Sequence, residues 1–152
     1  MEKHHYNVDI NWNQDRKGMM CSPELASSNS ITANCIEVAT PPDFLKGMPN
    51  IWSPEHLFTA SVSSCLMTTF LAIAENSKLD FSGFSCKSKG VMERVDGKYL
   101  MTEVILEPTV TIKDEKDRER AEKILQKSEA ACLISNSIKS KVTMEVSIKI
   151  DA

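Results

Sequence analysis

The amino-acid sequence predicts an α+β fold with largely antiparallel sheets, a long buried central helix and a second, amphipathic helix. Three observations lead to this prediction. Residues 53–76 carry no Lys, Arg, Asp or Glu between Glu55 and Glu75. The dipeptide Asp96-Gly97 is a strong hairpin signal between two strand-like segments. Residues 115–134 repeat apolar side chains at helical spacing.

The N-terminal region is expected to form strands. Apolar and polar side chains alternate from Tyr6 to Trp12, which predicts a strand with one buried face. The following Gln14–Gly18 segment is typical of a turn. A second strand is expected within residues 19–25 and a third within 31–39, with a tight connection at residues 27–30.

Residues 40–53 are expected to be irregular because they contain three prolines and a glycine. The same segment holds apolar side chains, namely Phe44, Leu45, Met48, Ile51 and Trp52. An apolar loop before a buried helix can cover a pocket. It can equally close the end of the core, and the sequence leaves both interpretations open.

A helix is expected to begin at Pro54. Ser53 can accept hydrogen bonds from free backbone amides, and Pro54 and Glu55 suit the first turn of a helix. Its apolar and small side chains extend around the whole circumference, which predicts burial on every side. A membrane span is the rival interpretation, but hydroxyl side chains repeatedly interrupt the apolar run.

The second half is expected to contain a hairpin, a helix and a final strand. The hairpin arms are residues 84–95 and 98–112, and Pro108 suggests an edge strand or a bulge. Asp114 can cap a helix that runs to about Ile134 and turns Cys132 inward. Residues 142–150 alternate apolar and polar side chains, as one last strand would.

Length and composition limit the class of protein. The 152 residues are expected to form one domain, residues 1–152, and the net charge of −3 argues against nucleic-acid and anionic-membrane partners. The five cysteines include no C-x-x-C pair, so neither a metal site nor a disulfide framework is expected. No signal-like apolar run occurs near Met1, which favours a cytoplasmic location with reduced thiols.

Two inward-facing thiols are the main candidates for chemistry. If their helices pack together, Cys65 and Cys132 could form a reversible disulfide. Burial raises a thiol pKa, so Cys65 needs a cation or a donor to become a thiolate. Arg16 is the natural cation and Glu55 its expected carboxylate partner. The alternative is that both are ordinary buried cysteines, since Cys often packs as a small apolar residue.

Two motifs resemble the signature helices of the OsmC/Ohr family of thiol peroxidases. One is Pro54-Glu55-His56-Leu57-Phe58 with Cys65 ten residues after the glutamate, and the other is the segment from Ala131 to Asn136. The early turn containing Arg16 and the order of elements also match. Many members have His and Pro where this chain has Glu129 and Leu133 around the second cysteine.

The resemblance implies an intertwined homodimer with active sites at the subunit interface. It implies that Cys65 is the peroxidatic thiol, Cys132 the resolving thiol, and Arg16 with Glu55 the activating pair. The substrate would be an organic hydroperoxide, and a lipoyl or thioredoxin-like dithiol would be the reductant, with no cofactor. A module binding a small lipophilic ligand and a thiol redox sensor remain alternatives, because a fold alone does not define an activity.

Overall fold

The computed structural model describes residues 1–25 and 34–152, which divide into two compact units. The N-terminal unit is Met1–Leu57 and the C-terminal unit is Phe58–Ala152. The boundary falls inside the first turns of the helix α1 (Pro54–Asn76). The tight connection expected at residues 27–30 lies outside the described residues.

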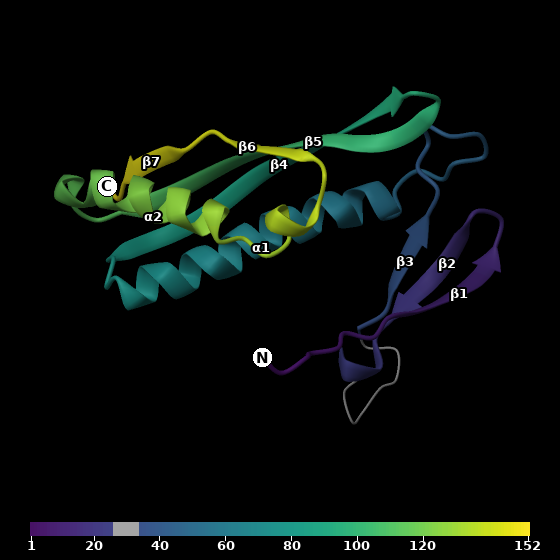
Figure 1. Cartoon of the computed structure of the whole chain (residues 1–152), viewed down its shortest axis with the longest axis horizontal. Helices are drawn as coiled ribbons and strands as arrows, with labels where there is room; N and C mark the ends of the chain where they lie inside the picture. Colours follow the sequence, from purple (N-terminus) through teal and green to yellow (C-terminus); the bar gives the residue numbers. More distant parts are fainter. Residues whose placement is uncertain (26–33) are drawn as a thin grey trace. The chain divides into compact units, whose positions relative to one another are not determined.

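The N-terminal unit contains a three-stranded antiparallel sheet in the order β1 (Asp9–Gln14), β2 (Lys17–Cys21) and β3 (Ile36–Ala39) (Figure 1). The predicted turn is confirmed, because Asp15 and Arg16 join β1 to β2. A Cβ atom on Gly18 would lie 2.5 Å from the backbone oxygen of Asn11. The close approach of β1 to β2 therefore requires glycine at this position. A short 3₁₀ helix, η1 (Pro23–Leu25), follows β2.

The prediction that the apolar face of β1 is buried is wrong for a single copy of the chain. All six residues of β1 are exposed, with Ile10 and Trp12 at 61% and 77% relative exposure. The alternation is present, but β1 is an edge strand, and the described residues leave its apolar side chains uncovered. An apolar strand face of this kind is typical of an interaction surface.

The irregular segment before α1 is confirmed. Turns and a single bridge between Val38 and Trp52 hold it against β3, and Ala39 N donates to Trp52 O at 2.8 Å. The predicted helix start is also confirmed, since the His56 amide donates to Ser53 Oγ at 3.2 Å. Both features follow from local chemistry, proline in the loop and a hydroxyl cap at the helix end.

Helix α1 is buried along one stripe only, which corrects the prediction of burial all round. Val62, Leu66, Phe70 and Ala74 are completely buried, whereas Met67 and Leu71 are about two-fifths exposed. In length and composition α1 could cross a membrane, a test that a core helix of a soluble protein also passes.

The C-terminal unit is built on a long antiparallel hairpin of β4 (Phe81–Val95) and β5 (Lys98–Ile112). The Asp96-Gly97 turn is confirmed, with φ of 50° and 79° as a primed turn requires. The expected last strand is instead two strands, β6 (Lys141–Met144) and β7 (Ser147–Ile150), which both pair in parallel with β5.

Pro108 explains why the last strand is broken. It lies in β5, which has β4 on one side and β6 and β7 on the other, so β5 is not an edge strand as expected. Residues 103–106 pair with β6 and residues 109–112 with β7. Pro108 has no N–H to donate to the sheet. It occupies the gap between these two pairings, where the missing N–H donor destabilises the sheet least.

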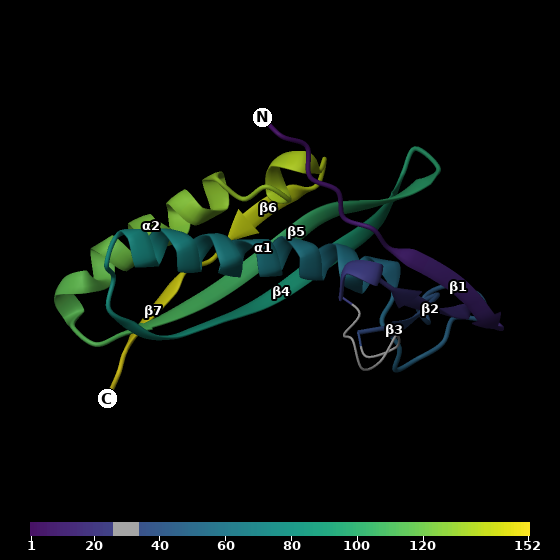
Figure 2. The ribbon, with the colours of Figure 1, turned by 90° about the horizontal axis from the view of Figure 1, so that it is seen from below.

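Helix α2 (Arg118–Ala130) ends four residues earlier than expected, and it follows a 3₁₀ helix, η2 (Glu115–Asp117). Asp114 caps η2 by accepting a hydrogen bond from the Lys116 amide. Figure 2 shows α1 and α2 side by side over one face of the C-terminal sheet. Their apolar stripes and β5 form a common core, which contains Phe70, Ala74, Val110, Ile112, Ala121 and Leu125. The fold is α+β, as predicted.

Candidate active site

The C-terminal unit brings the two candidate thiols together. Cys65 is half-buried on α1, and Cys132 is completely buried in the turn that follows α2. The two side chains are within hydrogen-bonding contact. The expectation that the thiols would face each other is met, but only one of them is on a helix.

The turn after α2 places Cys132. The Ala131 amide still donates to Lys127 O, whereas the Cys132 amide donates to Glu129 O in a tighter turn. The Asn136 amide then donates to Cys132 O at 3.0 Å, and a 3₁₀ helix, η3 (Ser135–Ser137), follows. Ser and Asn favour such turns because their side chains compete for backbone hydrogen bonds. The polar Ser-Asn-Ser sequence therefore suits the 3₁₀ turn that follows Cys132.

Hydrogen bonds favour the thiolate form of Cys65. Burial by itself raises the pKa of this thiol, but donors around the sulfur outweigh burial and lower the pKa below its ordinary value. The donors are the Cys132 thiol, the backbone amides of Ile134 and Leu133, and the Thr69 hydroxyl. Two successive amides that point at one atom form an anion-binding concavity. The turn after α2 therefore acts on Cys65 as the positive group that a buried thiol needs.

The pKa of Cys132 moves in the opposite direction. Burial and the hydrogen bond to Cys65 raise it, although hydrogen bonds with the side chain and backbone of Ser135 oppose the rise. Cys65 is thus the thiol that ionises first, and Cys132 remains its protonated neighbour. A thiolate beside a thiol is the arrangement in which one sulfur attacks and the other later closes a disulfide.

Glu129 extends this cluster through Ser135. The Ser135 hydroxyl donates to Glu129 Oε2 at 3.3 Å, and burial raises the pKa of Glu129 above its ordinary value. Sequence reasoning missed Thr69, Ser135 and Glu129. Thr69 could have been found, because it follows Cys65 by four residues and so lies one helical turn away. The contacts of Ser135 depend on the turn after α2, which no periodic pattern marks.

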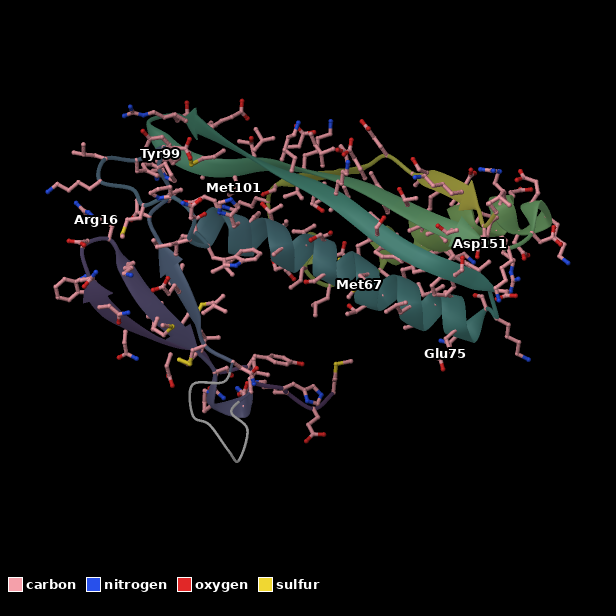
Figure 3. The ribbon with its side chains drawn as sticks, turned by 180° about the vertical axis from the view of Figure 1, so that it is seen from behind. Arg16, Met67, Glu75, Tyr99, Met101 and Asp151 are labelled. Atoms are coloured by element: carbon pink, nitrogen blue, oxygen red, sulfur yellow. A yellow bond between two sulfur atoms is a disulfide. The ribbon has the colours of Figure 1, made fainter. Side chains whose placement is uncertain are left out.

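Arg16 and Glu55 belong to the N-terminal unit. Arg16 lies at the turn between β1 and β2 (Figure 3), and both residues line a cavity of about 630 Å³. Glu55 Oε2 is buried, and Lys17 beside Arg16 pairs with Glu37 at 3.1 Å. The rest of the wall is mostly apolar and includes Ile10, Trp12, Val38, Ala39, Pro41 and Phe44. The cavity combines apolar walls with two cations and one carboxylate, Glu55.

A disulfide joins Cys21 and Cys35, which corrects the expectation that the thiols are reduced. Cys21 ends β2 and Cys35 immediately precedes β3, so the antiparallel pairing of Met20 with Ile36 brings the two sulfurs together. A sequence separation of 14 residues gave no hint of this contact. Among the described residues, no group of three or more His, Cys, Asp or Glu could hold a metal ion.

The fold is similar to that of several solved structures. An OsmC-like protein of unknown function from Vibrio cholerae matches with a TM-score of 0.81 at 20% identity, covering 95% of this chain and 99% of the other. An organic hydroperoxide resistance protein OsmC from Legionella pneumophila matches with a TM-score of 0.73 at 19% identity, covering 98% and 99%. OhrB of Bacillus subtilis, an organic hydroperoxide resistance protein, matches at 0.67 and 16% identity, covering 96% and 98%. These matches define an OsmC-like fold.

Sequence comparison assigns the family. The model of the OsmC-like protein family matches residues 47–147, about two-thirds of the chain. The protein YmaD of Bacillus subtilis, described only as uncharacterized, is 25% identical over 99% of this chain and 98% of its own length. The chain belongs to the OsmC-like family.

Proposed function

We propose that this protein is a cysteine-based peroxidase that reduces organic hydroperoxides. The observation that carries the proposal is the asymmetry of the thiol pair, in which Cys65 has a lowered pKa and Cys132 a raised one. A peroxidatic thiol has to be a thiolate, and a resolving thiol has to lie within reach of it. Membership of the OsmC-like family supports the same function.

The reaction follows from the positions of the two sulfurs. The Cys65 thiolate attacks the terminal oxygen of ROOH, the O–O bond breaks, and the alkoxide takes a proton and leaves as an alcohol. Cys65 becomes a sulfenic acid, which condenses with the Cys132 thiol to form a disulfide and water. A dithiol, of the lipoyl or thioredoxin type, then reduces the disulfide by thiol–disulfide exchange.

The substrate class is supported by the cavity of the N-terminal unit. Its apolar walls suit the alkyl or aryl part of an organic hydroperoxide better than hydrogen peroxide, because apolar surface is buried there on binding. Arg16 and Glu55 line this cavity, and we propose them as the activating pair. Replacing Arg16 with Lys should lower kcat/KM for cumene hydroperoxide, because Lys cannot make the planar bidentate pair with Glu55.

A homodimer in the cytoplasm is part of the proposal. Apolar side chains exposed on β1 and α1, with Trp12 at 77% and Leu71 at 40% exposure, support a second copy as the covering partner. Sedimentation velocity measures this directly. A species of twice the chain mass is expected, and a stable monomer would contradict the shared-site arrangement.

The test of function is a single-turnover reaction. One equivalent of cumene hydroperoxide is added to the protein after Cys65 and Cys132 have been reduced, and the reaction is quenched within seconds by an alkylating agent. Peptide mass analysis should find a new Cys65–Cys132 bond, and the Cys65→Ser variant should not form it. The Cys86→Ser variant is the matched control, since Cys86 is also a free thiol, and it should react normally.

Other outcomes point to the alternative functions. If Cys65 oxidises no faster than Cys86, the peroxidase proposal fails, and the cavity should be tested for binding of an apolar ligand. If the disulfide forms but no dithiol reductant supports repeated turnover, a redox sensor replaces the enzyme. Each outcome thus selects one function.

A further inference from the structure

Contacts link four side chains in a row, namely those of Cys65, Cys132, Ser135 and Glu129. The proposed peroxidase mechanism uses only the two cysteines. Cys132 contacts Cys65 on one side and Ser135 on the other, and the Ser135 hydroxyl donates to Glu129 Oε2. Glu129 lies in the last turn of α2, three residues before Cys132, so the helix end holds both. All four side chains are at least partly buried.

The second chemical step is closure of the disulfide, and it requires that Cys132 lose its proton. In the reduced protein the Cys132 thiol donates to the Cys65 sulfur. Once Cys65 is a sulfenic acid, Cys132 has to lose that proton before it can attack as a thiolate. Its surroundings oppose this loss, because burial raises the pKa of Cys132. A proton acceptor within the cluster would remove the obstacle.

We infer that Ser135 and Glu129 form a proton relay that deprotonates the resolving thiol Cys132. This inference rests on the proposed peroxidase function. The single hydroxyl hydrogen of Ser135 is used in the hydrogen bond to Glu129 Oε2, which leaves Ser135 Oγ as an acceptor toward Cys132. Ser135 Oγ accepts the thiol proton from Cys132 and passes its own proton to the Glu129 carboxylate. Ser135 is thus the catalytic residue, because it touches the reacting sulfur, and Glu129 is a positioning residue that acts through it.

The step balances without any further reactant. The Cys132 thiolate attacks the Cys65 sulfur, an S–S bond forms, the S–O bond breaks, and hydroxide leaves. The proton held on Glu129 returns to the hydroxide, which becomes water. Two sulfurs are oxidised to a disulfide overall and the peroxide oxygen is fully reduced. Glu129 ends as the carboxylate and is ready for the next cycle.

The environment of Glu129 suits a temporary proton store. Burial raises its pKa, and the hydrogen bond from Ser135 partly opposes this rise. The titratable groups of the cluster are Glu129 on α2, Cys132 in the turn and Cys65 on α1. A carboxyl with a raised pKa holds a proton more readily at neutral pH than an exposed one, so transfer from Cys132 is easier.

The experiment separates the two chemical steps. Protein with reduced Cys65 and Cys132 is mixed with one equivalent of cumene hydroperoxide. Samples are quenched at intervals with dimedone, which traps sulfenic acid, and with an alkylating agent, and are then mapped by mass spectrometry. Wild type is compared with Glu129→Gln, Glu129→Asp and Ser135→Ala across a pH series. Glu119→Gln, an exposed carboxylate of α2 paired with Lys123, is the matched control.

Glu129→Gln and Ser135→Ala should form the Cys65 sulfenic acid at the wild-type rate and close the disulfide about a hundredfold more slowly, at the low end of general acid–base effects. Glu129→Asp should recover part of the rate. Dimedone-trapped Cys65 should therefore accumulate in the first two variants. The rate of disulfide closure should also lose a pH dependence that the control keeps.

The relay is overturned if both Glu129→Gln and Ser135→Ala, folded by circular dichroism, close the disulfide at the wild-type rate with the wild-type pH profile. If one variant fails to fold, the other decides. A failure of the proposed function looks different, because then no sulfenic acid forms on Cys65 even in the wild type.

Discussion

At the scale of single residues, the reactivity of Cys65 depends on which donors surround its sulfur. A Cys three turns into a helix gains little from the helix dipole, and burial raises its pKa. The Cys132 turn and Thr69 reverse the direction of the shift. The donors that lower the pKa of Cys65 are therefore neutral groups of its own unit.

Replacing Thr69 with Val tests one of these donors without changing the shape of the side chain. Loss of the hydroxyl should raise the pKa of Cys65, because the thiolate loses a hydrogen bond. The pH at which the rate of Cys65 alkylation by iodoacetamide is half-maximal should then shift upward. The alkylation rate at neutral pH should fall.

Thr68→Val is the matched control, since the Thr68 hydroxyl donates to the backbone oxygen of Cys65 and not to its sulfur. Its pH profile should overlay that of the wild type. An unchanged profile for Thr69→Val would remove Thr69 from the site.

At the scale of elements, α1 packs so closely on β4 that one glycine is required. A Cβ atom on Gly90 would lie 2.1 Å from Thr59 Oγ1 on α1, far inside van der Waals contact. Gly83 in the same strand is different, because its nearest neighbour would be 3.5 Å away at Thr111 Oγ1. A larger side chain would therefore clash at Gly90 but would fit at Gly83.

Gly90→Ala should lower the free energy of unfolding by about 1–3 kcal/mol, the usual cost of overpacking. Urea denaturation followed by circular dichroism measures it. Gly83→Ala should change the midpoint little, and Thr59→Ala should rescue Gly90→Ala in part. Equal midpoints for the two glycine variants would contradict the close packing of α1 on β4.

At the scale of the whole molecule, a cross-link and exposed apolar surface determine stability and assembly. The Cys21–Cys35 disulfide spans the connection from β2 to β3 in the N-terminal unit. A cross-link that closes a loop of about 15 residues reduces the entropy of the unfolded chain and stabilises the fold by about 3 kcal/mol in the chain-entropy model.

The double variant Cys21→Ser/Cys35→Ser should lower the thermal midpoint, measured by circular dichroism without reductant. The same midpoint should be insensitive to added dithiothreitol in the variant and sensitive in the wild type. Cys86→Ser, which removes a free thiol, should retain the wild-type sensitivity. A wild type whose Cys21 and Cys35 are alkylated without reduction would contradict the disulfide.

Assembly is tested on the exposed side of α1. Leu71→Lys places a charge on an apolar surface that the proposed dimer would bury, so the sedimentation coefficient should fall to that of a monomer. Lys127→Ala on the exposed side of α2 is the control and should leave the oligomer intact. Identical sedimentation of both variants would exclude this side of α1 from the interface.

The sequence by itself determined most of the elements and pointed to the two candidate thiols. Local signals, such as Ser53-Pro54 at the start of α1 and Asp96-Gly97 in the hairpin, act between neighbouring residues and can be read directly. The family motifs likewise pointed to Cys65 and Cys132, and the structure brings these two thiols into contact.

Only the tertiary structure decided how these residues meet. The division of the last strand at Pro108 and the Cys21–Cys35 bond both depend on contacts between distant segments. The same holds for the donors that lower the pKa of Cys65. The physical reason is that periodicity and turn chemistry report on neighbours along the chain. Hydrogen bonds across the fold depend instead on distances that no local pattern contains.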